Sequence, residues 1–127
     1  MPIVTLTVRR SASRALRAKV LEAIHGALVE SAGANPDDRF HRVLELDEAD
    51  FQFDAKFPDV KTARTADFVL AEILLGAGRS VRIKKKVVAD VVERVSAQGI
   101  DPENLMVVFL DVPWENWSPA GGRVPHA

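Results

Sequence analysis

The residue whose type and position best suit it to chemistry is Pro2, which directly follows the initiator methionine. Removal of Met1 would turn Pro2 into a secondary amine at the tip of the strand-like run over residues 3–8. A free α-amino group titrates at about 7.7 to 8.0, nearer to neutrality than lysine, and a proline ring holds its nitrogen rigidly. The N-terminus is therefore a candidate catalytic group. Many chains also begin Met-Pro for reasons of processing alone, so this interpretation needs partners elsewhere in the sequence.

Composition limits the classes of function that the chain can have. The chain has 127 residues, 47% of them hydrophobic, and a formal net charge of -1. This length predicts a single domain over residues 1–127, and the near-neutral charge removes the general attraction to nucleic acid or to an anionic membrane. The sequence contains no cysteine, which excludes disulfides, thiol catalysis and zinc-thiolate sites. Because the sequence shows neither a signal-peptide pattern nor an apolar run long enough to span a membrane, we expect a soluble, cytoplasmic protein.

An internal repeat organises the chain. Gly33 and Pro36 recur 66 positions later as Gly99 and Pro102, and the same shift places Pro2 on Phe68. Between these anchors run two apolar stripes with the i, i+4, i+5, i+8 spacing of a helix that packs on one side. At a shift of 67 the stripes match member by member: Leu16, Val20, Leu21, Ile24 and Leu28 in the first, and Ile83, Val87, Val88, Val91 and Val95 in the second.

The repeat predicts an α+β fold made of two β-α-β units. Units of this length give a four-stranded sheet that carries both helices on one face. The repeat occupies about residues 2–47 and 68–112, joined by a connecting segment over 48–67 and followed by a C-terminal tail over 113–127. Strands are expected over residues 3–8, 39–46, 67–75 and 104–111, and helices over about 13–32 and 80–98. Ser13 and Ser80 stand where N-caps belong, and Gly33 and Gly99 stand where left-handed C-caps belong.

The second face of the predicted sheet has no helix to cover it, which argues for an oligomer. Phe51, Phe53 and Phe57 make the connecting segment too apolar for an idle solvated loop, and Trp114 and Trp117 do the same for the tail. These aromatic side chains either meet a neighbouring subunit or fold back on their own. Glu72 interrupts the apolar strand over 67–75, and this position calls for a buried partner or a place near the site.

At this point the residues resemble a known family. A β-α-β repeat behind Met1-Pro2 is similar to the tautomerase superfamily, and several segments resemble its malonate semialdehyde decarboxylase branch. The matching segments are residues 23–27 (Ala-Ile-His-Gly-Ala), 38–40 (Asp-Arg-Phe), 79–80 (Arg-Ser), 117–118 (Trp-Ser) and 121–123 (Gly-Gly-Arg). The order and spacing of these segments carry the resemblance, which covers nearly the whole chain.

The resemblance implies a role for each matched residue. Pro2 would supply the catalytic amine, and Asp38 would lie close to it and assist proton transfer or water activation. Arg79 would bind the substrate carboxylate, for which its planar fork of donors is suited, beside the free amides at a helix start. Trp117 would help to wall the pocket. Each residue also has an ordinary interpretation: Arg79 as a solvated turn residue, Asp38 as the end of a turn, and Trp117 as part of the core or an interface.

His25 has a packing interpretation of its own. It lies on the flank of the apolar stripe of the first helix, where a packed and hydrogen-bonded histidine is commoner than a catalytic one.

Two departures from the family pattern bear on the reaction. The decarboxylase branch usually carries a second arginine two residues before the position of Arg79, where this chain has Ala77. That difference puts decarboxylation in doubt, and Arg82, near the start of the second helix, is the hypothesised replacement for the missing charge. The chain also contains no tyrosine, so Phe40 follows Arg39 and a branch that relies on a phenol donor fits poorly.

The expected chemistry depends on the protonation of the Pro2 amine. A nearby carboxylate such as Asp38 favours the ammonium form, whereas apolar walls and Arg79 favour the neutral amine. We predict a protonated Pro2 that acts as a general acid in hydration or decarboxylation of a short oxo or unsaturated acid, without a cofactor or metal. The alternatives are a keto-enol tautomerase with Pro2 as general base and a ligand-binding or structural member of the fold without catalysis. The resemblance also implies a homotrimer.

Overall fold

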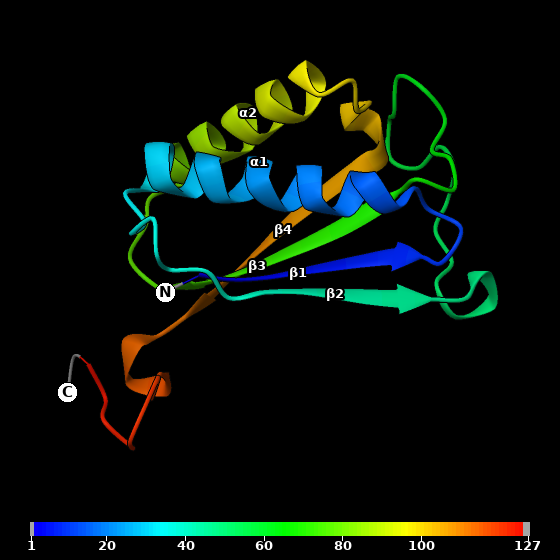
Figure 1. Cartoon of the computed structure of the whole chain (residues 1–127). Helices are drawn as coiled ribbons and strands as arrows, with labels where there is room; N and C mark the ends of the chain where they lie inside the picture. The colour runs from blue at the N-terminus through cyan, green and yellow to red at the C-terminus, as the bar shows by residue number, and fades with distance from the viewer. Residues whose placement is uncertain (1, 126–127) are drawn as a thin grey trace.

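The computed structural model of the chain, which describes residues 2–125, contains the two predicted β-α-β units (Figure 1). The first unit consists of β1 (Pro2–Arg9), α1 (Arg14–Ala32) and β2 (His41–Leu46). The second unit consists of β3 (Val69–Gly76), α2 (Val81–Ala97) and β4 (Leu105–Val112). Three short 3-10 turns accompany them, η1 (Glu48–Asp50), η2 (Pro102–Asn104) and η3 (Trp114–Asn116). Each predicted strand and helix is therefore confirmed, with ends shifted by one or two residues.

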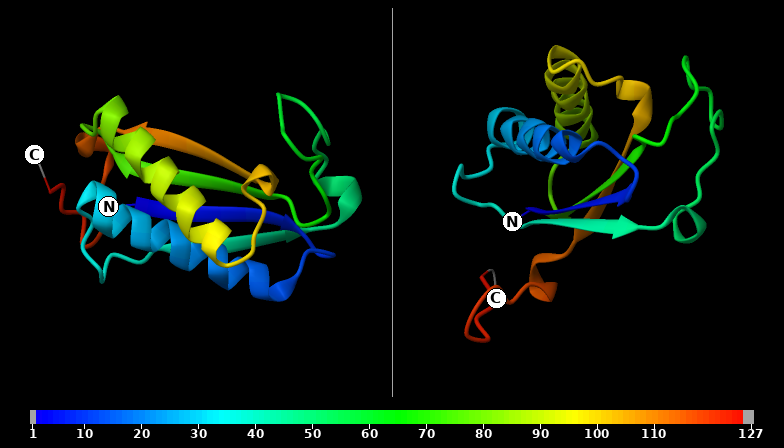
Figure 2. Two further views of the ribbon diagram at one scale, coloured as in Figure 1. Left: turned by 90° about the horizontal axis from the view of Figure 1, so that it is seen from above. Right: turned by 45° about the vertical axis from the view of Figure 1, so that its right-hand side comes forward.

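The four strands form one mixed sheet in the order β2-β1-β3-β4. Each unit is parallel within itself, because β1 pairs with β2 and β3 with β4 in the same direction. The two units join through their first strands, which run antiparallel. Both helices lie side by side on one face of the sheet, and the C-terminal segment extends on the other side (Figures 1 and 2). The expected α+β architecture is confirmed.

Alternation along the strands builds the core between the sheet and the helices. Val4, Leu6 and Val8 of β1 are buried, and so are every second residue of β3 from Val69 to Leu75. The buried side of α2 meets them with Val87, Val91 and Val95, and the corresponding stripe of α1 packs beside it. The two stripes found in the sequence are thus the faces that hold the helices on the sheet.

The helix ends differ in how they are capped. The Ser80 Oγ accepts a hydrogen bond from the Ile83 amide (3.2 Å), so this predicted N-cap is confirmed. Ser13 occupies the N-cap position of α1, but its side chain makes no capping bond. Its backbone amide instead donates to the Asp67 carboxylate (2.9 Å), which ties the start of α1 to the segment before β3. Gly33 ends α1 in the left-handed conformation (φ 70°), as expected for glycine.

The face of the sheet opposite the helices, called the open face below, carries a row of charged and polar side chains within an apolar surface. In the strand register Thr5 lies between Arg42 of β2 and Glu72 of β3. The Arg42 Nε donates to the Thr5 Oγ1 (2.7 Å), and both charged residues line a hollow of about 190 Å³. Around this row Leu44, Val108 and Leu110 are between 40% and 44% exposed.

The aromatic residues of the connecting segment divide between the two arrangements that the sequence left open. Phe51 and Phe53 fold back on their own chain, where both rings pack against the buried Phe68. The Arg9 guanidinium lies 4.1 Å from the centre of the Phe53 ring. Phe57 is 74% exposed, which makes it the apolar side chain of this segment best placed to meet a neighbour. Among residues 2–125, no helix is both long and apolar enough to cross a membrane.

Candidate active site

Pro2 is the first residue of β1 and lies at one end of the sheet. It is buried and pairs in the antiparallel register with Leu75, the penultimate residue of β3. Leu75 in turn pairs with Asp111 of β4. The start of β1 therefore meets the segment that leads from β3 into α2. Met1 lies outside the described residues.

Asp38 reaches the same end through the pairing of β1 with β2. The Val4 amide donates to the Phe40 carbonyl oxygen (2.8 Å), which extends the parallel pairing one residue before β2. Pro2 precedes Val4 by two residues, and Asp38 precedes Phe40 by two. Because the paired strands are parallel, both residues lie beyond this hydrogen bond in the same direction. Asp38 is half-buried, and a turn in which its amide donates to the Asn35 carbonyl oxygen (2.9 Å) leads into it.

Arg79 lies in the loop between β3 and α2, four residues beyond the partner of Pro2. Gly78 gives this loop a backbone angle (φ 120°) that side chains disfavour, so the chain can turn sharply before Ser80 begins the helix. The Arg79 Nη1 donates back to the Gly76 carbonyl oxygen (3.3 Å). Its Nε is buried and has no hydrogen-bond partner among residues 2–125. A guanidinium with an unpaired N–H donor beside the start of a helix is suited to bind an anionic group.

Trp114, in the C-terminal tail, packs against the loop between β3 and α2. Its Nε1–H donates to the Ala77 carbonyl oxygen (2.9 Å), and the Ala77 amide donates to the Val112 carbonyl oxygen (2.9 Å). The indole lies so close to Gly76 that an added Cβ would stand 2.3 Å from its Cζ2. The resemblance implied Trp117 as a pocket wall, and the contact of Trp114 with this loop was not expected from the sequence. The glycine before Ala77 was the available signal, since glycine within a strand often marks close approach of another group.

Trp117 lies behind Trp114 and belongs to the packed interior of the tail. It is 7% exposed, and its Nε1–H donates to the Val112 carbonyl oxygen (3.1 Å). The two indole rings are tilted, with centroids 6.3 Å apart. Trp117 thus supports Trp114 at the end of the sheet where Pro2 begins.

Arg82 faces away from the core of the chain. It lies in the first turn of α2 and is exposed, as are Lys85 and Lys86 at i+3 and i+4. Residues at these spacings share one side of a helix. Within the single chain, Arg82 therefore points to solvent, whereas Arg79 turns back toward the end of β3.

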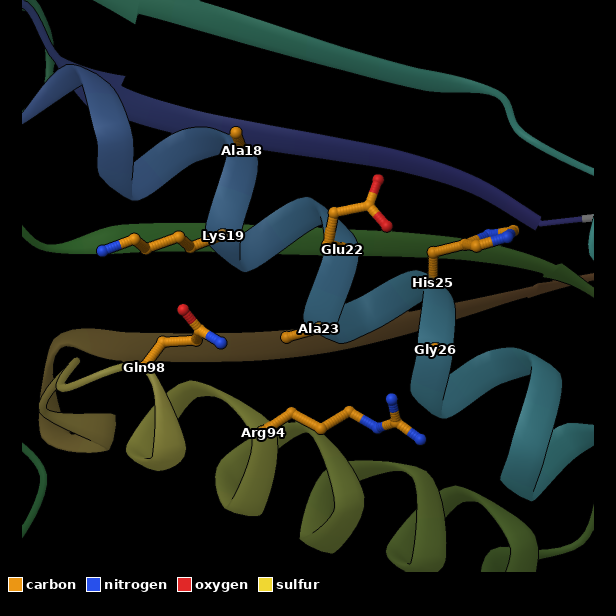
Figure 3. Close-up of a pocket in the computed structure, with 8 residues that line it drawn as sticks. All are labelled: Ala18, Lys19, Glu22, Ala23, His25, Gly26, Arg94 and Gln98. Carbon is orange, nitrogen blue, oxygen red and sulfur yellow. The ribbon is translucent and has the colours of Figure 1, made fainter.

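A separate hollow of about 490 Å³ lies between α1 and α2 (Figure 3). Its lining includes Glu22, His25 and Arg94 but not Pro2, Asp38 or Arg79. Two of its three charged side chains among the described residues are engaged within the chain, since Glu22 pairs with Arg39 and Arg94 pairs with Asp90, and Lys19 is the third. Groups that are already neutralised in this way offer little to a ligand. The chemistry of the residues, rather than the size of the hollow, therefore places the candidate site at the Pro2 end.

Three segments meet at that end: the start of β1, the loop that enters β2, and the loop between β3 and α2 (Figure 1). They bring a candidate amine, a carboxylate and a guanidinium to one end of the sheet. Such a set can bind a small carboxylate and move a proton to or from it. Among residues 2–125, no cluster of three or more histidine, aspartate or glutamate side chains could hold a metal ion.

Comparison with known proteins finds solved structures of similar fold. The chain has a TM-score of 0.83 to FG41 malonate semialdehyde decarboxylase inhibited by 3-bromopropiolate, at 22% identity over 96% of this chain and 92% of the other. A second malonate semialdehyde decarboxylase gives a TM-score of 0.83 at 20% identity, over 96% and 93%. The symmetric trimer of a fused 4-OT gives 0.72 at 25% identity, over 96% and 94%. Comparison with curated protein sequences finds no match. A family model described as tautomerase enzyme matches residues 38–120, and the chain therefore belongs to the tautomerase superfamily.

Proposed function

We propose that this tautomerase-family enzyme acts without a cofactor on a small oxo or unsaturated carboxylic acid, by decarboxylation or hydration. Pro2 and Asp38 are the catalytic residues of this proposal, Arg79 binds the substrate carboxylate, and Trp117 walls the pocket together with Trp114. The observation that carries the proposal is the strand register, in which Pro2 is paired with the strand that leads directly to Arg79. The similarity of fold to malonate semialdehyde decarboxylases supports the same substrate class.

The proposed mechanism uses the Pro2 amine in its protonated form. Asp38 favours the ammonium ion, which donates a proton toward the carbonyl oxygen of a 3-oxo acid. The electron pair of the bond to the carboxylate then moves into the carbon framework, carbon dioxide leaves, and an enol remains that regains a proton on carbon. In hydration, Asp38 accepts a proton from the attacking water, and Pro2 supplies one to the carbon or oxygen that becomes negative. Arg79 holds the carboxylate in the orientation that these steps need.

A keto-enol tautomerase with neutral Pro2 as general base is the second candidate. The observation that favours it is Ala77, which stands where the decarboxylase branch usually carries an arginine, and whose backbone is occupied by the tail. A site with less positive charge holds a carboxylate less firmly, but it still allows a base to remove a proton next to a carbonyl group. Direct titration of the 15N-labelled Pro2 nitrogen separates the two. A protonated amine at about pH 7 supports the acid, and a neutral amine at that pH supports the base.

The assay compares purified protein with a Pro2→Ala variant on malonate semialdehyde, 3-haloacrylates and phenylenolpyruvate. Turnover of the first two by the parent, with a fall of at least tenfold in the variant, is the expected result. Equal rates for the two proteins would sink both enzymatic proposals, and no turnover on any substrate would favour a ligand-binding or structural protein. Intact-mass measurement of the natively expressed protein accompanies the assay. Retained Met1 would leave the Pro2 nitrogen as an amide, which cannot serve as acid or base.

We also propose that the chain forms a homotrimer through its open face. Its apolar residues, Leu44, Val108 and Leu110, would be covered by a second copy. The same face carries Arg42 and Glu72, whose opposite charges suit pairing between copies, because a charge buried at an interface needs a partner. Similarity in fold to the fused 4-OT trimer supports this assembly.

A further inference from the structure

The loop that carries Asp38 is held from one side by α1. This loop, residues 33–40, leaves α1 through Gly33 and makes a turn at Asn35, whose carboxamide oxygen accepts from the Asp37 amide (2.8 Å). It ends at Phe40, which is bonded to β1. Short backbone hydrogen bonds alone leave a surface loop of this length free to open. Additional contacts are therefore needed if Asp38 is to keep a fixed position.

Two side chains of α1, spaced three residues apart, supply such contacts. His25 Nε2 lies 2.9 Å from the Pro36 carbonyl oxygen, two residues before Asp38. One residue after Asp38, the Arg39 guanidinium makes a forked pair with the Glu22 carboxylate, at 2.6 and 3.3 Å. Residues at i and i+3 share a helix face. Figure 3 shows Glu22 and His25 projecting from the same side of α1, away from Arg94 of α2.

The environment of His25 defines the direction of its hydrogen bond. Its side chain is 5% exposed, and a carbonyl oxygen can only accept, so the Nε2 must carry a hydrogen and donate it to Pro36. The ring meets His41 of β2 edge to face, with centroids 5.6 Å apart. Burial, followed by the charges of His25 and Arg39, lowers the pKa of His41, which keeps this neighbour neutral. His25 is thus fixed between the loop and the first residue of β2.

We propose that His25 and Glu22 are positioning residues, which together clamp the loop over residues 33–40 and thereby hold Asp38 in place. This inference rests on the proposed function, in which Asp38 takes part in proton transfer. Neither residue is proposed to touch the substrate. His25 acts through the Pro36 carbonyl and Glu22 through Arg39. A proton-transfer group that shifts by about 1 Å loses on the order of a hundredfold in rate, so a loose loop lowers turnover without weakening the binding of the carboxylate.

The first variant pair tests the histidine bond. His25→Leu removes the donor, whereas His25→Gln places an amide N–H at a similar reach and restores it. We expect His25→Leu to lower kcat at least tenfold with KM within twofold of the parent, and His25→Gln to return kcat to within threefold. Because a partly unfolded variant would also lower the apparent kcat at unchanged KM, kcat is calculated per folded molecule, and a positioning residue lowers it even then. Failure of glutamine to restore kcat, or a rise in KM instead of a fall in kcat, would overturn the positioning role.

The second two variants test the ion pair between Glu22 and Arg39. Both substituted positions are exposed on α1, so neither substitution should disturb folding. Glu22→Gln weakens the forked pair with Arg39, and Glu30→Gln makes the same chemical change two turns further along the helix. Glu22→Gln is expected to lower kcat three- to tenfold, and the control is expected to leave it unchanged. Equal effects of the two substitutions would show that the contact with Arg39 does not hold the loop.

Amide hydrogen exchange of residues 33–40 provides a readout that needs no turnover. We expect exchange in this segment to become at least tenfold faster in His25→Leu and in Glu22→Gln, with β3 unchanged and with protection restored in His25→Gln. Unchanged exchange in both variants would overturn the clamp whatever the kinetics show. Faster exchange with unaltered kcat would overturn its link to Asp38. A parent without turnover would sink the proposed function, and exchange would then decide the clamp by itself.

Discussion

A methyl group added at Gly76 would collide with the indole of Trp114. In Gly76→Ala the new Cβ would stand 2.3, 2.4 and 2.7 Å from three carbons of that ring. No folded protein tolerates such contacts, so the indole must move, and its hydrogen bond to the Ala77 carbonyl oxygen (2.9 Å) must lengthen or break. Because the ring is rigid and packs on Trp117, it has little freedom to turn aside.

The size of the effect follows from three contributions. Overpacking costs about 1 to 3 kcal/mol, and loss of one hydrogen bond costs about 0.5 to 1.5 kcal/mol. Replacing glycine by alanine offsets about 0.4 to 1 kcal/mol through the unfolded chain. The net loss is about 2 kcal/mol in the free energy of unfolding. With an unfolding entropy of about 2.1 cal/mol/K per residue over 127 residues, this loss lowers Tm by about 7 °C.

Gly26→Ala is the matched control, because its Cβ would also stand 2.3 Å from a neighbouring atom. That atom is the Arg94 Nη1, at the far end of a flexible side chain that can turn aside. Alanine is also preferred to glycine inside a helix by about 0.5 to 1 kcal/mol. We therefore expect Gly26→Ala to leave Tm unchanged or raise it by a few degrees.

Thermal unfolding followed by circular dichroism, at one protein concentration for all variants, measures both changes. A double-mutant cycle with Trp114→Ala then isolates the collision, since Gly76→Ala should cost little once the indole is gone. A coupling of at least about 1 kcal/mol is expected for groups in direct contact. Additive effects, or a Gly76→Ala variant as stable as its parent, would refute the close packing of Trp114 on β3.

Three further predictions concern the carboxylate site, the open face and a half-buried histidine. Arg79→Lys, which keeps the charge but loses the planar fork, is expected to raise KM for the substrate about tenfold. Arg82→Ala tests whether Arg82 replaces the arginine that is missing at Ala77. Unchanged turnover and substrate affinity in this variant would exclude Arg82 from the site. Arg42→Glu is expected to dissociate the trimer by light scattering, and addition of Glu72→Arg to restore it; a monomeric parent would contradict the proposed assembly. Because burial lowers the pKa of His41, the unfolded chain binds its proton first, so stability falls as pH drops below about 6.5. Urea unfolding should show this loss in the parent and not in His41→Asn, and identical profiles would exclude His41 as its source.

The periodic parts of the molecule were accessible from the sequence because they depend on local spacing. The two apolar stripes predicted the positions of both helices. The Ser80 Oγ caps its helix by accepting a hydrogen bond from the amide of Ile83, three positions away. His25 was expected to be a packed, hydrogen-bonded residue, and its burial against the Pro36 carbonyl confirms this. One helical turn determines the Ser80 cap, whereas the partner of His25 lies 11 positions away in a loop, so the sequence indicated the packing of His25 but not its partner.

Features that depend on contacts between distant segments could not be predicted from the sequence. Ser13 makes no side-chain cap, and its amide donates to Asp67, which lies in a segment 54 positions away. The second strand begins at His41 rather than at residue 39, since the Arg39 amide bonds within a turn and its side chain reaches α1. Glu72 could be explained only after the register had placed it in one row with Thr5 and Arg42.

The match of Pro2 with Phe68 in the repeat has a consequence for the number of sites. The two units join antiparallel through β1 and β3, so equivalent positions lie at opposite ends of the sheet. Where one end begins with a proline, the other begins with a buried phenylalanine that Phe51 and Phe53 cover. Duplication thus left one end available for chemistry and allowed the other to become part of the core. A reagent that alkylates the Pro2 amine should add once to each chain, and an assembly should carry as many sites as subunits.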